Sequence, residues 1–213
     1  MYGFCFYMKF NIITIFPNIF DSYFNESIIK RAIQKKLVKI NIHNLRDFTK
    51  DKHKTVDDKP YGGGPGMVMM VEPIYKALKK IKKTKKTKII LFSAKGKKFD
   101  QKMAKSFSKL DNLIMVCGRY EGVDERVTKF VDQEVSIGDY VLTGGEIPAM
   151  IVTDAVARLI PGVLGKKESL EEIKGSYSVY TRPEDFNKLK VPKVLLSGDH
   201  KKVEEWRKNK GGI

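Results

Sequence analysis

Cysteine, histidine and tryptophan are scarce in this sequence of 213 residues, which contains two cysteines, three histidines and one tryptophan. Cys5 and Cys117 lie far apart in apolar surroundings, which argues against a disulfide scaffold and is typical of a reducing compartment, so we expect a cytoplasmic protein. His43, His53 and His200 are scattered and form no metal-ligand spacing with the cysteines. The sequence therefore predicts no metal centre built from these side chains.

Long hydrophobic runs are also missing. No apolar stretch reaches the roughly 18 residues that a membrane-spanning helix requires, so we expect no membrane partner. The apolar first residues lack both a basic start and a small-residue cleavage site, which argues against a signal peptide. Met8 is a second candidate start, which would make residues 1–7 an extension.

Acidic residues are fewer than basic ones, 25 against 41, which gives a net charge of +16. Such a charge favours a polyanionic partner, and nucleic acid is a commoner one than an anionic membrane. The alternative is a compositional bias, because most of the excess is lysine. The hydrophobic fraction of 42% is typical of a globular chain.

Hydrophobic patterning predicts that strands and helices alternate along the chain. The expected strands cover residues 9–16, 38–44, 88–93, 112–117 and 132–137, and the expected helices cover residues 27–37, 73–83, 100–109, 121–130 and 148–159. This alternation predicts an α/β fold with a parallel sheet, formed by residues 1–164. Residues 165–178 are expected to be a polar linker, and residues 179–213 a small segment with two short helices.

Three loops follow the carboxyl ends of predicted strands, at residues 93–95, 118–120 and 138–140. In a parallel sheet these ends meet at one edge, where ligands bind. The sequence therefore predicts a ligand pocket built from these three loops.

A glycine-rich string, residues 61–67 (YGGGPGM), is the most specific local motif. Its glycines permit positive φ angles and the close approach of another backbone or a ligand. It lacks the lysine of a Walker loop and the spacing of a dinucleotide fingerprint. Two interpretations stay open: a tight loop packed at an interface, or a close-contact loop at a cofactor or RNA site.

Two further strings follow predicted strands, residues 118–126 (GRYEGVDER) and residues 136–146 (SIGDYVLTGGE). In the first, Glu121 could accept hydrogen bonds from a ribose or an amine, or could be a solvated acid favoured by a helix dipole. The second could present backbone groups to an adenine edge, or could be a turn that leads into a helix. Arg158 in the string DAVAR is either functional or part of an exposed helix stripe.

These strings, together with IITIFPNIF, LRDFTKDKHKTVDDKPYGGGPGMVMM, DAVARLIPGVLG and YTRPE, resemble the tRNA (guanine37-N1)-methyltransferases of the SPOUT superfamily from Met8 to about Arg207. The resemblance implies a parallel sheet tied in a deep trefoil knot and a homodimer whose active sites are built from both chains. It implies S-adenosylmethionine as methyl donor and the tRNA anticodon stem-loop as substrate, and it leaves open whether Mg²⁺ is needed.

By position match, the resemblance implies these cofactor-binding residues: Leu91, Ser93, Ala94, Gly118, Tyr120, Glu121, Ile137, Gly138, Asp139, Tyr140, Val141, Leu142, Gly144, Gly145 and Pro148. The reaction needs a base near guanine N1, which must lose a proton, and a cation near O6, where negative charge grows. The resemblance assigns the cation to Arg158, because a planar guanidinium suits an oxygen acceptor. The target base must also leave its stack.

The general base departs from the family pattern. The family usually places an aspartate after two acids, whereas here Ile173 follows Glu171 and Glu172. We therefore predict that Glu172 or Glu171 acts as the base. Ala94 stands where the family tends to have proline, and the chain stops at Ile213, short of a basic helix, which would weaken RNA binding and its salt dependence.

Two rival hypotheses follow from these departures. One is a catalytically weakened RNA-binding relative, and the other is a SPOUT methyltransferase that acts on a different RNA position.

Overall fold

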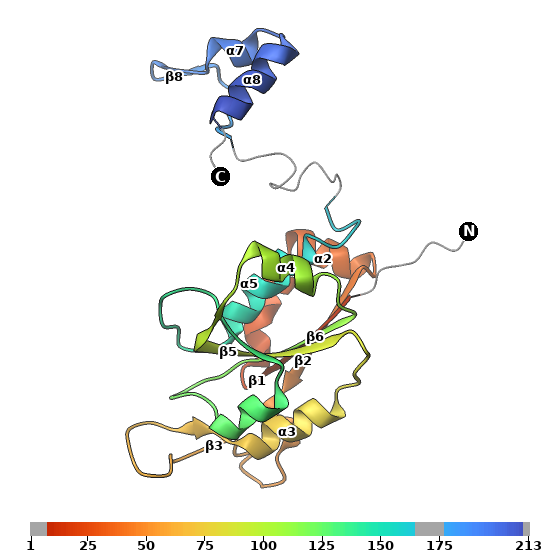
Figure 1. Ribbon diagram of the computed structural model, residues 1–213, viewed down its shortest axis with the longest axis vertical. Helices are drawn as coiled ribbons and strands as arrows, with labels where there is room; N and C mark the ends of the chain where they lie inside the picture. The colour runs from red at the N-terminus through yellow and green to blue at the C-terminus, as the bar shows by residue number, and fades with distance from the viewer. Residues whose placement is uncertain (1–7, 165–176, 211–213) are drawn as a thin grey trace, which may run out of the picture. The chain divides into compact units, whose positions relative to one another are not determined.

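The computed structural model of the chain describes residues 8–164 and 177–210. The chain divides into two compact units, Met1–Leu164 and Gly165–Ile213. The first unit carries the central sheet and all of the elements that surround it (Figure 1).

Five strands form one parallel sheet in the order β2-β1-β6-β5-β7. Their bounds are β1 (Met8–Thr14), β2 (Val38–Asn44), β5 (Thr87–Lys98), β6 (Asn112–Val116) and β7 (Gln133–Ser136). The mixed α/β class with a parallel central sheet, predicted from the alternation of elements, is thereby confirmed. The carboxyl ends of β6, β5 and β7 are neighbours, and this adjacency positions the site described below.

Helices cover both faces of the sheet (Figure 1). On one face lie α2 (Ser27–Gln34), α4 (Gln101–Phe107) and α5 (Glu146–Ala157), and on the other lies α3 (Val71–Lys80). Strand β6 shows how the sequence specifies the two layers. Leu113 and Met115 belong to the core under the first three helices, whereas Ile114 and Val116 belong to the core under α3. Each buried side chain of this size stabilises the fold by about 1.5–3 kcal/mol.

Short elements connect these layers. They are η1 (Pro17–Phe20), α1 (Asp21–Phe24), η2 (Leu45–Phe48), β3 (Asp57–Asp58), β4 (Val68–Met69) and η3 (Glu125–Phe130). Helix α4 begins after Asp100, whose carboxylate accepts a hydrogen bond from the Met103 backbone N–H at 2.7 Å. This is a side-chain cap of the kind that ordinarily stabilises a helix start by about 1 kcal/mol.

Two elements differ from the sequence-based expectation. Strand β5 continues to Lys98, and its pairing with β7 shifts register between Phe92 and Lys97. The helix predicted over residues 121–130 is only the 3-10 helix η3, because the chain before it turns sharply, with a positive φ of 59° at Tyr120.

The second unit contains a two-stranded hairpin, β8 (Asp185–Phe186) with β9 (Leu189–Lys190), and the helices α7 (Lys193–Leu196) and α8 (His200–Lys210). Two short helices were expected here from the sequence, whereas the hairpin was not. Tyr180 packs against Trp206 of α8 with a ring-centroid distance of 6.1 Å.

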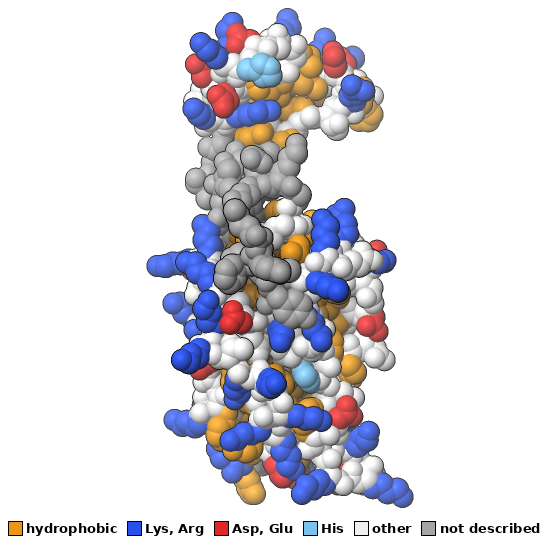
Figure 2. All heavy atoms as spheres, turned by 90° about the vertical axis from the view of Figure 1, so that its right-hand side faces the viewer, with side chains coloured by type: hydrophobic (Ala, Val, Ile, Leu, Met, Phe, Trp, Pro, Cys, Tyr) orange, Lys and Arg blue, Asp and Glu red, His pale blue; other side chains and the backbone are white. Residues whose placement is uncertain are grey.

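Basic side chains are spread widely over the face shown in Figure 2, where acidic side chains are fewer. Within residues 8–164 and 177–210, no helix combines the length and the apolar character needed to cross a membrane.

Candidate functional site

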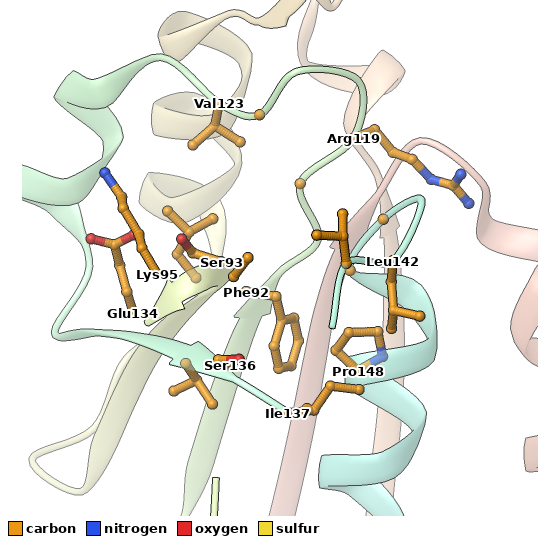
Figure 3. A pocket seen from close by; sticks show the side chains of 18 of the residues that line it. Phe92, Ser93, Lys95, Arg119, Val123, Glu134, Ser136, Ile137, Leu142 and Pro148 are labelled. Atoms are coloured by element: carbon orange, nitrogen blue, oxygen red, sulfur yellow. The ribbon is translucent and has the colours of Figure 1, made fainter. Parts of the chain in front are cut away.

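A cavity of about 520 Å³ opens at the carboxyl ends of β5, β6 and β7 (Figure 3). This volume lies within the range of small-molecule sites. The lining residues come from β5, from the loop after β6 and η3, from β7 and the loop after it, and from the first turn of α5. They are Leu91, Phe92, Ser93, Ala94, Lys95, Gly118, Arg119, Tyr120, Glu121, Gly122, Val123, Glu125, Thr128, Glu134, Val135, Ser136, Ile137, Tyr140, Val141, Leu142, Thr143, Gly144, Gly145 and Pro148.

The cavity brings together all of the predicted cofactor-loop residues except Gly138 and Asp139. The two exceptions follow from the local turn after β7. The Asp139 carboxylate forms an ion pair with Lys98, and the Gly138 backbone N–H donates to Ser136 Oγ at 3.3 Å. These two residues are therefore not among those that line the cavity, and their contact with the cofactor stays a prediction.

One wall of the cavity is apolar. Figure 3 shows Phe92, Ile137, Leu142 and Pro148 gathered on this wall, from β5, the loop after β7 and the start of α5. Side chains of this kind pack against a flat ring, while the neighbouring glycine-rich loop leaves backbone groups open to its edge.

The opposite wall is polar and charged. Lys95 Nζ lies 3.0 Å from Glu125 Oε2, and Figure 3 shows Lys95 beside Glu134. The hydrogen bond that Lys95 donates to Glu125 and the nearby charge of Glu134 raise the pKa of Lys95. Over the cavity lining as a whole, the carboxylates of Glu121, Glu125 and Glu134 outnumber the cationic side chains of Lys95 and Arg119, which suits a ligand that carries positive charge.

Arg158, the one predicted catalytic residue that lies in the described part of the chain, does not line this cavity. Arg158 is exposed and caps the carboxyl end of α5, whereas Pro148 lines the cavity near the start of the same helix. At about 1.5 Å per residue, some 15 Å of helix separates the two positions. Glu171 and Glu172 lie outside the described residues.

Two charged residues received no role from the sequence: Arg119, which belongs to a predicted pocket loop and lines the cavity, and Glu146 beside it. Glu146 is only 1% exposed, and its Oε2 accepts a hydrogen bond from Arg119 Nε at 3.0 Å. An acid directly after a pair of glycines at a helix start was visible in the sequence. Nothing in the local pattern distinguished a buried acid from a solvated one.

The glycine-rich string packs against the loop after β6. The Glu121 backbone N–H donates to Met67 O at 3.0 Å. Just after the string, Met69 forms an isolated β-bridge with Val123. Tyr61, at the start of the string, is fully exposed. The string is thus a tight loop packed against the loop after β6, and its contact with a cofactor or RNA stays a prediction.

Among the described residues, no group of three or more His, Cys, Asp or Glu side chains is arranged to hold a metal ion.

Comparison with known proteins identifies the family. The model of the tRNA (Guanine-1)-methyltransferase TrmD family matches residues 8–212. A tRNA (guanine-N(1)-)-methyltransferase of Dictyoglomus turgidum is 53% identical over 206 residues, which cover 94% of this chain and 84% of the relative. A protein of the same name from Clostridioides difficile is 52% identical over 210 residues, covering 94% of this chain and 91% of the relative.

A solved structure agrees with these relatives. The crystal structure of tRNA (m1G37) methyltransferase from Aquifex aeolicus matches with a TM-score of 0.81 and 44% sequence identity, over 93% of this chain and 87% of that chain. Because the family model spans nearly the whole sequence and these relatives share about half of their residues with it, the chain belongs to the tRNA (guanine-N1)-methyltransferase family.

Proposed function

We propose that this protein transfers a methyl group from S-adenosylmethionine to N1 of the guanosine at tRNA position 37. The observation that carries the proposal is the cavity at the ends of β5, β6 and β7, in a chain of this family. Relatives that are about half identical carry the name of this activity.

The cavity fits the donor by its chemistry. Its apolar wall suits an adenine ring, and Glu121 is placed to accept hydrogen bonds from a ribose or an amine. The carboxylates on the polar wall favour a ligand with a positive sulfonium. The donor supplies a methyl group that is already activated, and the protein contributes the binding and orientation of the two reactants.

The acceptor requires further groups. Guanine N1 must lose its proton, and charge then develops on O6. We assign the stabilisation of O6 to Arg158, and the removal of the proton to Glu172 or Glu171. Since Arg158 does not line the cavity of its own chain, the proposal includes a homodimer in which each cavity receives this arginine from the second copy.

An exposed apolar surface supports the homodimer. It consists of Phe16, Ile19, Tyr23, Ile147 and Ile151, which we call the apolar face. Ile147 and Ile151 are one helical turn apart on α5. The segments are joined by a hydrogen bond of 2.8 Å from Tyr23 Oη to Asp154. An apolar surface that adjoins the start of α5 is suited to cover the same surface of a second copy.

Two finer features of the family also belong to the proposal. The deep trefoil knot is supported by the close passage of the loop after β7 beside the loop after β6, where the Gly145 backbone N–H donates to Gly118 O at 2.9 Å. Binding of the anticodon stem-loop by the second unit is supported by the basic residues of α8, such as Lys201, Lys202 and Arg207.

The decisive experiment compares two anticodon stem-loops that differ only in guanine or adenine at position 37. With labelled S-adenosylmethionine, we expect label on N1 of that guanosine and none on the adenine stem-loop. Glu171→Gln and Glu172→Gln are assayed in parallel, and we expect the variant that lacks the base to slow transfer about 10²-fold or more.

Each alternative outcome has a defined meaning. Donor binding without transfer to either stem-loop would favour the weakened RNA-binding relative. Label on a different base would favour a SPOUT enzyme for another position. Unchanged rates in both glutamine variants would remove the glutamates from the mechanism.

A further inference from the structure

Glu146 is a buried carboxylate that has no role in the proposed reaction. It opens α5, it is 1% exposed, and it does not line the cavity. Its Oε1 accepts a hydrogen bond from Thr14 Oγ1 at 2.8 Å, at the end of β1. Its Oε2 accepts the bond of 3.0 Å from Arg119 Nε. A charge that is so fully removed from water is retained only where it is paired, as it is here.

Arg119 connects this carboxylate to both cavity loops. It belongs to the loop after β6, and Figure 3 shows its guanidinium directed away from the cavity interior. Nη1 donates to Thr143 O, in the loop after β7, at 3.3 Å. The guanidinium also lies 4.7 Å from the centre of the Phe16 ring. A single side chain thus spans the two loops and the strand end of β1.

The loop after β6 and the loop after β7 are in direct contact at Arg119 and Gly144. Arg119 and Gly144 form a backbone bridge. A Cβ atom on Gly144 would lie 2.3 Å from Arg119 Nε and 2.7 Å from Glu146 Oε2. The ion pair therefore packs directly on the backbone of the loop after β7.

We propose that Arg119 and Glu146 are positioning residues that hold the loop after β6 and the loop after β7 at one fixed spacing, and so set the affinity for the methyl donor. Neither side chain acts on the donor or on the transferred methyl group. We call this pair the loop clamp. The inference rests on the proposed function, because it assigns the donor to the cavity between these loops.

The clamp has a specific energetic consequence. A charged pair that is joined by one hydrogen bond, and whose arginine donates a second one to Thr143 O, fixes geometry more strongly than neutral contacts do. If one partner loses its charge or its fork geometry, the loops gain freedom that the donor must then remove on binding. Affinity falls for this reason, whereas the rate from the saturated complex stays nearly the same.

The test is a calorimetric titration of the full chain with S-adenosylmethionine. Arg119→Lys keeps the charge but loses the fork, and Glu146→Gln keeps the acceptor but loses the charge. We expect the Kd for the donor to rise about tenfold in each. The turnover number at saturating donor should stay within about threefold, and the KM for RNA should not change. The double variant should bind no more weakly than either single variant, because both disrupt one unit.

Arg126→Lys is the matched control. Arg126 follows the same strand and pairs with Asp124 at 2.6 Å, but it does not line the cavity, so the Kd should equal that of the wild type. A second readout is hydrogen exchange in the absence of donor, where the Gly145 amide should lose protection in the clamp variants only. This readout, together with the more conservative Arg119→Lys variant, tests the clamp if Glu146→Gln does not fold.

Three outcomes would overturn the clamp. They are an unchanged Kd in folded variants, a loss confined to the turnover number, and unchanged exchange at Gly145. These failures leave the proposed function intact, because the wild type still binds and transfers. A wild-type protein that does not bind the donor would instead refute the proposed function, and with it the effect of the clamp on donor affinity, whereas altered exchange at Gly145 in the clamp variants would still show that the pair holds the two loops together.

Discussion

At the scale of single residues, a polar ladder crosses the otherwise apolar sheet. Asn11 in β1 donates to Asn112 in β6 at 2.7 Å and accepts from Asn41 at 3.0 Å and from His43 Nε2 at 2.8 Å, both in β2. Asn112 in turn donates to Lys82 O at 3.0 Å. Each member is paired, so the ladder fixes the register of three strands without leaving a buried polar group unsatisfied.

The ladder predicts a pH dependence of stability. Partial burial, and then the charge of Lys80, lower the pKa of His43 below its ordinary value of 6.5. The unfolded chain therefore binds a proton more readily than the folded chain. The stabilisation from His43 is fully present above pH 6.5 and is lost as the pH falls through 6.5 toward the folded pKa.

His43→Gln keeps a donor for Asn11 but cannot titrate. We expect its free energy of unfolding, measured in urea between pH 5 and 8, to fall less steeply toward acid than that of the wild type. His53→Gln, which changes an exposed histidine, is the control and should follow the wild-type slope. Equal slopes for wild type and His43→Gln would contradict the assignment.

Residues that line the cavity could be predicted from the sequence where the position of the backbone alone decides whether a residue reaches it. Glu121 and Ile137 reach the cavity because parallel strands end at one edge of the sheet, and this holds independently of their side-chain contacts. The side-chain partners of Asp139 and Glu146 could not be predicted in this way. Asp139 turns toward Lys98, and Glu146 is buried by Arg119 and Thr14, partners that are distant in sequence.

At the scale of elements, the glycine-rich string contacts the Glu121 side chain through Gly66. A Cβ on Gly66 would lie 2.5 Å from Glu121 Oε1, and Gly66 has a φ of +77°. Gly63, in the same string, has a φ of +81° with nothing within 4 Å. The two positions therefore share the backbone requirement and differ only in the contact with Glu121.

This contrast predicts different effects for two similar substitutions. Gly66→Ala and Gly63→Ala should each cost about 1 kcal/mol of stability, because both force alanine into a left-handed conformation. Only Gly66→Ala displaces Glu121, so only this variant should raise the donor Kd, by about tenfold if one charged hydrogen bond is lost. Thermal unfolding and donor titration of both variants measure the two effects separately. Equal donor affinity in both would show that Glu121 does not depend on this loop.

Strands β2 and β6 were predictable from the hydrophobic pattern of the sequence. The strand expected over residues 38–44 coincides with β2, and the strand expected over residues 112–117 is β6 to within one residue. The extension of β5 to Lys98 was not predictable, because its polar residues join the sheet only through pairing with β7. The start of the expected helix at residue 121 was wrong because tertiary contacts with the glycine-rich string hold that segment as a loop.

At the scale of the whole molecule, the position of Arg158 and the apolar face both favour the proposed homodimer. The arginine lies at the opposite end of α5 from the turn that lines the cavity, and Ile147 and Ile151 leave part of α5 uncovered. In a twofold dimer each copy contributes the same surface to its partner. A second copy packed against α5 can therefore place its arginine near the first copy's cavity, which a single chain does not achieve.

Subunit complementation tests this arrangement. Arg158→Ala leaves the cavity intact, and Leu142→Arg places a charge on the apolar wall, so each variant alone should lose at least about 10²-fold in turnover. After mixing and subunit exchange, half of the dimers are mixed, and each mixed dimer has one site with both an intact cavity and Arg158 from its partner. About a quarter of the wild-type activity should return.

If Arg158 served the cavity of its own chain, every site in the mixture would carry one defect and no activity would return. Ile151→Glu provides an independent check, because a charge on the apolar face should shift the protein to monomers in light scattering and abolish transfer. Since the donor cavity lies within one chain, this variant should still bind S-adenosylmethionine. Recovery in the mixture, combined with donor binding by the monomer, would assign the donor to one subunit and the O6 cation to the other.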